Sequence, residues 1–387
     1  MENIRFTLGH LPPKAEALRA EVRAFIAEHM KGVPGVVRAK SWAGFDKAFS
    51  KKMGDQGWIG MTWPKKYGGH ERSALERYVV LEEMLAAGAP VAAHWVADRQ
   101  SGPLLLRFGT EEQRQKYLPP ITRGESYFCI GMSEPNSGSD LASIRTRADK
   151  TNDGWVVNGQ KIWTSKAHEA DGMIALFRTA PVDPKDRHAG MSQFILDPRT
   201  PGITVRPIRN MVGEENFNEV FFEDLHLPAD ALVGTEGDGW GQVTTELAFE
   251  RSGPERYLSS YQLVFELVRA LAEDRAEGTV DRLAAQGLGR MIAHMGTLRR
   301  MSLSVATMLE AGETPNLASA FVKEVGVAYE QAIPFQTHDI MGRSPLMGGD
   351  PFDEVMNYNA LASRSFSLRG GTREVMRGII ARGLGLR

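Results

Sequence analysis

The chain has 387 residues, of which 42% are apolar and 24% charged, and its 46 Lys and Arg side chains nearly balance 48 Asp and Glu side chains. This composition excludes a disordered or collagen-like protein, and the absence of any long block of one charge argues against a nucleic-acid or membrane-surface partner. The length predicts two or three domains.

Targeting and metal-binding signals are missing from the sequence. No apolar run follows the first ten residues, and no stretch of about eighteen residues lacks strongly polar groups, so we expect neither secretion nor a membrane span. Cys129 is the only cysteine, and neither CxxC nor HExxH occurs. We therefore expect no intrachain disulfide, no structural zinc site of the common kinds, and a reducing cytoplasm as the location.

Residues 1–124 are predicted to form an all-helical N-terminal domain. Apolar residues recur at helical spacing over residues 18–30, and similar patterns predict helices at 74–87 and 111–118. The pair Pro119-Pro120 is expected to end the last of these helices, because proline disfavours helical geometry in the residue before it.

Residues 125–235 are predicted to form a compact antiparallel, barrel-like β domain. The pair Asn158-Gly159 predicts a two-residue hairpin turn between strands at 155–157 and 160–164. Further strand candidates are short, rich in β-branched or aromatic residues, and separated by turn residues, at 173–179, 192–197, 202–209 and 219–227.

Residues 236–387 are predicted to form a C-terminal four-helix-bundle domain. The helical period returns at Trp240, and a stripe of residues that are apolar except for Ser302 steps alternately by three and four positions from Leu288 to Leu309. We interpret the methionines of this stripe as core or subunit contacts, since thioethers fill gaps between helices well.

The commonest nucleotide-binding and hydrolase motifs are absent from the sequence. The sequence has no GxGxxG after a strand, no GxxxxGK[ST] and no GxSxG, so the Rossmann, P-loop and α/β-hydrolase interpretations lose their usual anchors. In residues 128–140, hydroxyls, glycines and backbone amides crowd around one turn next to the β domain. Such a turn can present donors to a polar ring or a pyrophosphate.

The order of residues in this turn resembles the first signature of the acyl-CoA dehydrogenase flavoenzymes, hydroxyl-Glu-Pro-x-x-Gly-Ser-Asp, which matches Ser133 to Asp140. The likeness spans the whole chain. It continues through four further motifs in the expected order, at 108–113, 158–165, 222–228 and 370–375. The resemblance implies a helical, β, helical domain order and FAD as cofactor.

The resemblance places Met132, Ser133, Trp163 and Ser165 beside the isoalloxazine ring of the flavin. A hydroxyl at Ser133 or Ser165 can donate to the N5 and O4 edge of the ring as it becomes anionic during hydride transfer. Trp163 would shield one ring face, although a strand tryptophan is also a common core residue. Ser139 falls where the family contacts substrate or pyrophosphate.

The reaction implied by the resemblance needs one carboxylate base in a dry cleft. The family supplies it from a C-terminal loop or from the first helix of the C-terminal domain. Here the loop position holds Gly370, whereas Glu250 on the helix is followed by Arg251, as in the isovaleryl-CoA and long-chain enzymes. We therefore expect Glu250 to be the base, with Glu246 and Glu255 as rivals. For Arg251, a structural ion pair and a substrate contact remain alternatives, and Gly370 would leave room for the acyl chain.

The nucleotide half of the FAD site departs from the family pattern. Thr372 and Glu374 match positions that touch this half, but Glu374 is acidic where glutamine is commoner. The Arg-x-x-Phe-Gly-Lys loop, which in relatives reaches the FAD of a neighbouring subunit, should fall near residues 274–282 and is missing. A Gln-x-x-Gly-Gly segment is reduced to residues 339–342, which read Asp-Ile-Met-Gly.

These observations favour an FAD-dependent acyl-CoA dehydrogenase that forms an α,β-double bond in a CoA thioester, with a branched or bulky acyl chain, aliphatic or steroidal. The resemblance implies electron-transfer flavoprotein as electron acceptor and a homodimer or homotetramer. Two alternatives stay open. One is an oxidase or flavin monooxygenase on the same fold. The other is a half-catalytic subunit in a heterotetramer with a second acyl-CoA dehydrogenase chain, which the missing loop motivates.

Overall fold

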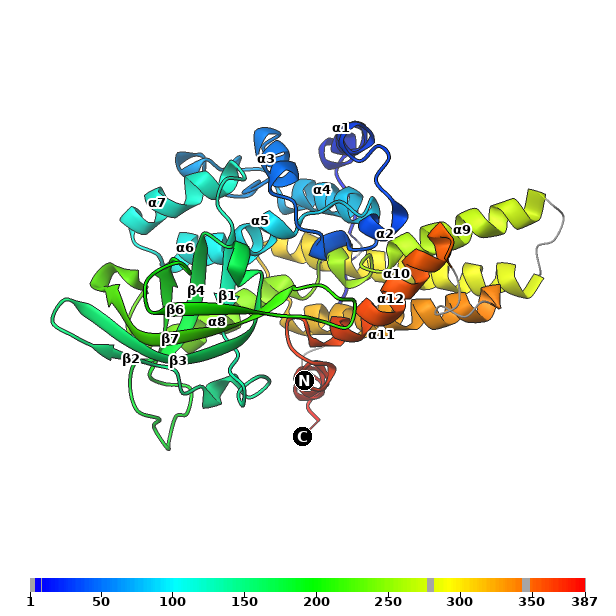
Figure 1. The fold of residues 1–387 in the computed structure, drawn as a ribbon. Helices are drawn as coiled ribbons and strands as arrows, with labels where there is room; N and C mark the ends of the chain where they lie inside the picture. The colour runs from blue at the N-terminus through cyan, green and yellow to red at the C-terminus, as the bar shows by residue number, and fades with distance from the viewer. Residues whose placement is uncertain (1–3, 8, 277–281, 343–348, 387) are drawn as a thin grey trace. The chain divides into compact units, whose positions relative to one another are not determined.

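The structure is a computed structural model in which the chain forms two compact units (Figure 1). Unit 1 contains Met1–Phe45, Arg72–Val91 and Ala248–Arg387, and unit 2 contains Asp46–Glu71 and Ala92–Leu247. The residues described are 4–7, 9–276, 282–342 and 349–386, without the side chains of 245–250 and 274–276.

The predicted sequence of helical, β and helical domains is confirmed as a fold class. The N-terminal helices, however, are divided between the two units, so the predicted boundaries after residues 124 and 235 stay a prediction. Among the described residues, no helix is both long and apolar enough to cross a membrane.

Unit 2 is built on one eight-stranded sheet in the order β6-β7-β3-β2-β4-β5-β8, with β1 paired to β4 outside this path. The strands are β1 (Phe128–Gly131), β2 (Arg147–Lys150), β3 (Gly154–Ser165), β4 (Gly172–Arg178), β5 (Met191–Leu196), β6 (Ile203–Ile208), β7 (Phe217–Pro228) and β8 (Leu232–Val233). The predicted antiparallel, barrel-like domain matches the fold, and the structure differs from it in two details. The β1–β4 and β2–β4 pairs are parallel, and the strand path does not close.

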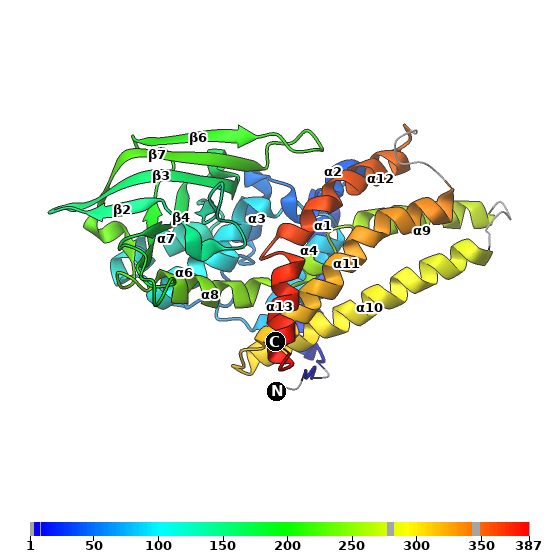
Figure 2. The same cartoon turned by 90° about the horizontal axis from the view of Figure 1, so that it is seen from below.

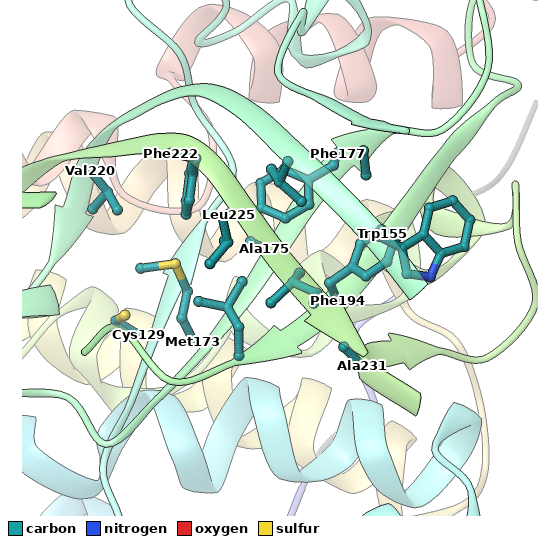
Figure 3. Close-up of a cluster of buried hydrophobic side chains, with 14 of the residues drawn as sticks. Cys129, Trp155, Met173, Ala175, Phe177, Phe194, Val220, Phe222, Leu225 and Ala231 are labelled. Atoms are coloured by element: carbon teal, nitrogen blue, oxygen red, sulfur yellow. The ribbon is translucent and has the colours of Figure 1, made fainter. Parts of the chain in front are cut away.

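The core of unit 2 is a cluster of buried apolar side chains on the inner face of this sheet (Figure 3). Phe177 lies between Phe194 and Phe222, with ring centroids 5.5 Å and 5.1 Å away. Trp155 meets Phe194 edge to face at 5.2 Å. Aromatic side chains bury large apolar areas, so this cluster accounts for much of the sheet's stability.

The predicted hairpin turn at Asn158-Gly159 was wrong, because β3 runs straight through it. The register with β7 shifts between Val157 and Gly159, which marks a bulge in place of a turn. Gly159 has φ +145°, and a Cβ there would lie 2.6 Å from the Thr146 hydroxyl. That hydroxyl accepts from the N–H of Gln160 and donates to its C=O, both at 3.1 Å, so the bulge is satisfied without a chain reversal.

Four helices of unit 2 accompany the sheet, namely α3 (Lys47–Asp55), α5 (Ala92–Val96), α6 (Gly102–Phe108) and α7 (Glu111–Thr122). The expected end of α7 at Pro119 was one turn too early. Both prolines stand in the last turn of the helix, where their fixed φ is helical, and each removes only one i→i−4 hydrogen bond from the end of the helix. The Pro119 carbonyl accepts from the Thr122 hydroxyl at 2.8 Å.

Unit 1 is helical, and α8 (Gly239–Glu250) connects the two units along the chain. Its helices are α1 (Pro13–His29), α2 (Gly35–Arg38), α4 (Ala74–Ala86), α9 (Tyr261–Ala276), α10 (Arg282–Glu310), α11 (Asn316–Met341), α12 (Pro351–Ala362) and α13 (Arg373–Gly383). Figure 2 shows α10 and α11 side by side, and α4 packs on α10. The predicted seam of α10 is confirmed, since Met291, Leu298 and Val305 are buried.

A buried polar network joins α1 and α4 to α10. Glu82 on α4 accepts hydrogen bonds from Arg299 at 2.7 Å, Arg19 at 3.0 Å and the Tyr257 hydroxyl at 3.1 Å. The Tyr78 and Tyr257 hydroxyls lie 2.9 Å apart. Because a buried carboxylate is costly unless it is hydrogen-bonded, this network fixes one arrangement of the three helices.

A second network joins α11 to α13. Glu324 accepts from Arg373 and Arg377, with the closest contacts at 2.6 Å and 2.9 Å. Partial burial by itself would raise the pKa of Glu324, but the hydrogen bonds from Arg373 and Arg377 outweigh it and lower this pKa below its ordinary value of 4.5. The resulting stabilisation is present above pH 4.5 and is lost as the pH falls through the lowered pKa.

We expect Glu324→Gln to lower the free energy of unfolding by about 1–3 kcal/mol at pH 7, since two charge-assisted hydrogen bonds are weakened. The difference from the wild type should shrink as the pH falls through the lowered pKa of Glu324, where this carboxyl group itself becomes protonated. Denaturant unfolding across this range measures it. Glu21→Gln, on the exposed face of α1, is the control. A pH-independent difference would contradict the assignment.

Candidate functional site

The turn that follows β1 carries three of the predicted flavin and substrate residues. Glu134 and Ser137 close it by exchanging backbone hydrogen bonds of 3.1 Å and 2.9 Å. Ser133 is half-buried just before this closure, and Ser139 is exposed just after it. Met132 packs against a small apolar cluster that includes Ile144, Leu176 and Met191. The turn is therefore a defined structure anchored at its start.

The second predicted flavin segment is a bulge in β3. The register with β7 shifts between Lys161 and Thr164, and Trp163 between them has φ +61°. The Trp163 side chain is 57% exposed and touches Phe217 only edge-on at 6.1 Å. The core interpretation of Trp163 is excluded, because its indole lies on the surface of unit 2.

The structure brings these two segments of unit 2 together. The Ile162 N–H donates to the Ser133 carbonyl at 2.9 Å, and the Lys161 ammonium donates to the Met132 carbonyl at 3.0 Å. Ser165, at the end of the bulge, pairs with Phe217 and is half-buried. Hence the two sequence-predicted segments, Met132–Ser133 and the bulge that carries Trp163 and Ser165, are held side by side, although about thirty residues separate them.

Lys161 and Glu134 are functional candidates that the sequence analysis did not single out. Their charged groups lie 2.8 Å apart, and the Lys161 side chain is completely buried. Burial lowers the pKa of Lys161 to about 8, although Glu134 opposes this shift. Burial alone would raise the pKa of Glu134, but Lys161 and backbone donors hold it below its ordinary value. The sequence signal was available, since both residues stand inside the motifs that carried the resemblance.

The residues predicted around the catalytic loop belong to unit 1. Arg251 donates from Nε to the Gly370 carbonyl at 3.2 Å, and the buried Lys323 ammonium donates to the Gly371 carbonyl. Gly370 and Gly371 have φ of +63° and +99°, which side chains rarely adopt. The loop thus requires glycine for its backbone alone, whether or not Gly370 also makes room for a substrate. Arg251 is a residue that holds this loop.

Thr372 and Glu374 begin α13 directly after the glycines. The Thr372 hydroxyl accepts from the Val375 N–H at 3.4 Å and so caps the helix. Glu374 is exposed, and its hydrogen bonds to its own backbone N–H and to Thr372 lower its pKa. Their predicted contact with the nucleotide half of FAD stays a prediction.

The candidate base Glu250 is the last residue of α8, but its side chain lies outside the described residues, as does that of its rival Glu246. The other rival, Glu255, is only 2% exposed and lies 3.5 Å from the equally buried Arg256 guanidinium. An enclosed ion pair of this kind favours a structural role for Glu255.

Arg369, next to the glycines, also escaped the sequence analysis. It donates to the fully buried Glu330 at 3.0 Å and to the Ser259 hydroxyl at 3.1 Å, and it stacks over Trp42 at 4.6 Å. Burial raises the pKa of Glu330, while Arg369 opposes the shift. No sequence pattern pointed to this pair, because its partners lie 39 positions apart in the chain.

A hollow on the surface of unit 2, with a volume of about 380 Å³, contains none of the predicted site residues. It is lined in part by Lys47, Glu169, Asp171 and Arg199. These charges neutralise one another, with Lys47 3.1 Å from Glu169 and Arg199 3.6 Å from Asp171. The hollow therefore presents no surplus of one charge to a ligand.

Comparison with protein-family models decides the family. The N-terminal, middle and C-terminal domain models of acyl-CoA dehydrogenase match residues 12–125, 129–225 and 237–385. The chain belongs to the acyl-CoA dehydrogenase family. The enzyme class predicted from the sequence, an oxidoreductase of the acyl-CoA dehydrogenase kind, is confirmed with it.

Curated relatives of this acyl-CoA dehydrogenase extend over nearly the whole chain. The acyl-CoA dehydrogenase IpdE1 of Mycobacterium tuberculosis is 33% identical over 386 residues, covering 96% of this chain and 97% of the relative. The acyl-CoA dehydrogenase FadE34 of the same organism is 33% identical over 379 residues. The match covers 96% of this chain but 49% of FadE34, so the chain spans about half the length of that relative.

Two solved structures share the fold over their full lengths. One, described as "Tcur3481-Tcur3483 steroid ACAD", has a TM-score of 0.87 at 29% identity and covers 98% of this chain and 99% of its own. The ChsE4-ChsE5 complex from Mycobacterium tuberculosis contains a chain with a TM-score of 0.82 at 30% identity, covering 100% of this chain and 99% of its own.

FAD is the cofactor of the acyl-CoA dehydrogenase family. The residues of unit 2 fit its ring in kind, because the exposed indole of Trp163 follows Ile162, whose N–H is bonded to the Ser133 carbonyl, and Ser165 lies two residues further along β3. In addition, the Thr164 hydroxyl is buried without a hydrogen-bond partner among the described residues, which leaves a polar atom for a partner outside the protein.

We expect Gly371→Ala to lower the free energy of unfolding of the flavin-loaded protein by about 1–2 kcal/mol, because an L-residue is strained at its φ of +99°. A Cβ there would also approach Met376 to 3.1 Å. The control is Gly378→Ala, in open space on α13, where alanine should add up to about 1 kcal/mol. Equal stability of the two variants in denaturant unfolding would contradict this account of the loop.

Proposed function

We propose that the chain catalyses the FAD-dependent α,β-dehydrogenation of an acyl-CoA thioester, with Glu250 taking the α-proton. One observation carries the choice of base. Arg251, the neighbour of Glu250, contacts Gly370, the residue that occupies the loop position where other family members place a carboxylate. The end of α8 and the loop therefore meet within unit 1, so a helix carboxylate can serve the position that the loop leaves without one.

The other residues hold the reactants in place. FAD, when bound, accepts the hydride from the β-carbon. Ser133 and Ser165 would donate hydrogen bonds to the flavin edge that gains negative charge, and Trp163 would cover a ring face and exclude water. Arg251 and Lys323 hold the Gly370–Gly371 carbonyls, which keeps the loop in the positive-φ conformation that its glycines permit. Removal of water beside the acyl chain would raise the basicity of Glu250.

For the substrate, we propose a bulky acyl chain of the steroid side-chain class. Two features support it: the loop carries glycine in place of a carboxylate, and a relative with 29% identity is described as a steroid ACAD. A dehydrogenase also fits better than an oxidase or monooxygenase on the same fold, because oxygen chemistry at the flavin needs no carboxylate base. Electron-transfer flavoprotein would then be the electron acceptor.

We propose that the protein works as an oligomer through the helices of unit 1. Large apolar side chains on α9, α10 and α11 are exposed, including Phe265 at 48%, Ile292 at 45% and Phe335 at 50%. Burying such side chains against another chain would be favourable. The missing Arg-x-x-Phe-Gly-Lys segment and the ChsE4-ChsE5 complex favour a second, different acyl-CoA dehydrogenase chain as one possible partner. Residues 277–281 of that region lie outside the described residues.

Glu250→Gln should keep the fold and the bound flavin but lose about 10²–10⁴ in the rate of flavin reduction, because the amide is nearly isosteric and cannot accept the proton. Stopped-flow reduction of the flavin-loaded variant by an acyl-CoA measures this rate. Glu255→Gln and Glu246→Gln serve as comparisons. A correctly folded, flavin-loaded Glu250→Gln with near wild-type reduction would refute the assignment, and inactivity of Glu246→Gln alone would move the base by one helical turn.

The state of assembly predicts how well the chain holds flavin by itself. A missing charge-assisted contact to the pyrophosphate is worth about 1.5–3 kcal/mol, so a chain that needs a different partner should retain flavin about ten- to a hundredfold more weakly when expressed alone. Light scattering and the flavin-to-protein ratio measure both properties. Full flavin occupancy in an active homo-oligomer would eliminate the heteromeric arrangement, and a flavin-poor protein would eliminate the homo-oligomeric one.

A further inference from the structure

The Lys161 side chain is the most enclosed cation in the sheet of unit 2. Its exposed fraction is 0%, and its ammonium lies 5.7 Å from the ring of Phe177, which belongs to the apolar core of the sheet (Figure 3). Its polar contacts are the Glu134 carboxylate at 2.8 Å and the Met132 carbonyl at 3.0 Å. The lysine therefore reaches across the core from β3 to the turn after β1.

Glu134 extends this contact to a third segment. One of its carboxylate oxygens accepts from the Thr146 N–H at 2.9 Å, and the other accepts from the Arg145 N–H at 2.6 Å. Both backbone donors lie just before β2. The pair thus connects the turn after β1, the start of β2 and strand β3 at one buried point.

The position of Lys161 in β3 connects its ion pair with Glu134 to the bulge. The register shift of the β3 bulge begins at Lys161, and the next residue, Ile162, donates its N–H to the Ser133 carbonyl at 2.9 Å. Met132 and Ser133 are consequently attached to the bulge by two contacts from successive residues. A movement of Met132 and Ser133 away from the start of the bulge would break one of these contacts.

Stability alone is a poor reason for such a pair. Placing two charges in an apolar core costs several kcal/mol of desolvation, and apolar residues of similar volume often stabilise a core as well or better. A buried pair of this kind is better accounted for by the conformation that it specifies. Here the specified feature is the spacing of two segments that both belong to the candidate flavin surface.

We propose that Lys161 and Glu134 are positioning residues that hold the Met132–Ser133 turn against the Trp163 bulge and so set the redox potential of the bound flavin. The inference rests on the proposed flavin site. A turn held in register keeps the Ser133 donor aimed at the ring edge that becomes anionic on reduction, and a donor fixed in advance stabilises the reduced form more than the oxidised form.

The test distinguishes two effects on the flavin potential, namely the effect of an uncompensated buried charge and the effect of losing the contacts that hold the turn. Lys161→Met leaves a buried negative charge and should shift the flavin potential to more negative values, whereas Glu134→Gln leaves a positive charge and should shift it to more positive values. The double variant Lys161→Met/Glu134→Gln has the same net charge as the wild type at this point. Any shift that remains in it reports the lost contacts to Met132, Arg145 and Thr146.

Potentials are measured at pH 7 on the flavin-loaded proteins, together with the melting temperature and the FAD dissociation constant. The matched control is Lys150→Met/Glu236→Gln, which removes an exposed ion pair of 2.7 Å in the same unit. We expect the double variant at 161 and 134 to melt above both single variants. Its potential should stay below the wild-type value by at least a tenfold change in relative stability of the reduced flavin, about 30 mV for a two-electron couple.

A double variant with wild-type potential and FAD affinity would overturn the inference, because the pair would then only balance charge. Lower melting temperatures with unchanged potentials in all variants would overturn it as well, since the pair would then be purely structural. Failure of the proposed function is distinguishable: a wild-type protein that binds no FAD would refute the flavin site itself before any variant is compared.

Discussion

Strand β3 has to be regular enough to pair with two neighbours and irregular enough to turn Trp163 outward. The bulge between Lys161 and Thr164 meets both demands, and the rest of the candidate flavin surface depends on it. It carries Trp163 at φ +61°, and it directs Lys161 into the core toward Glu134. The carbonyls of Met132 and Ser133 are then held by consecutive residues of one strand. The geometry of the flavin surface is therefore set by a backbone irregularity with a buried ion pair beside it.

The Gly370–Gly371 loop of unit 1 is likewise an irregular piece of backbone that is held by cationic side chains. Gly370 and Gly371 have positive φ, and the bend that they make would strain any other residue. The side chains of Arg251 and Lys323 hold the carbonyls of this bend. Arg369, fixed by Glu330 and Trp42, anchors the residue just before the bend. Cationic side chains thus hold the backbone on each side of the position where other family members carry their base. A base on α8, one residue before Arg251, is consistent with that arrangement.

The sequence predicted the fold well where periodicity is strong and less well where single residues decide. The buried stripe of α10 and the order of helical and β regions along the chain follow from the spacing of apolar residues. This spacing depends only on the local geometry of helices and strands. The hairpin at Asn158-Gly159 failed because Thr146, twelve positions away, satisfies the backbone of a bulge. The candidate flavin residues were predicted from motif order, and that prediction stays a prediction, whereas the contacts of Lys161 and Arg369 emerged only from partners that are distant in the chain.

This acyl-CoA dehydrogenase is proposed to remove hydrogen from the α- and β-carbons of a CoA thioester with a large acyl group. Anaerobic titration of the flavin-loaded protein with a panel of straight-chain, branched and steroid side-chain CoA thioesters tests it most directly. We expect bleaching of the flavin absorption band together with formation of an equimolar amount of the α,β-unsaturated thioester, strongest for the bulkiest acyl groups. A flavin that dithionite reduces but that no thioester in the panel bleaches would contradict it.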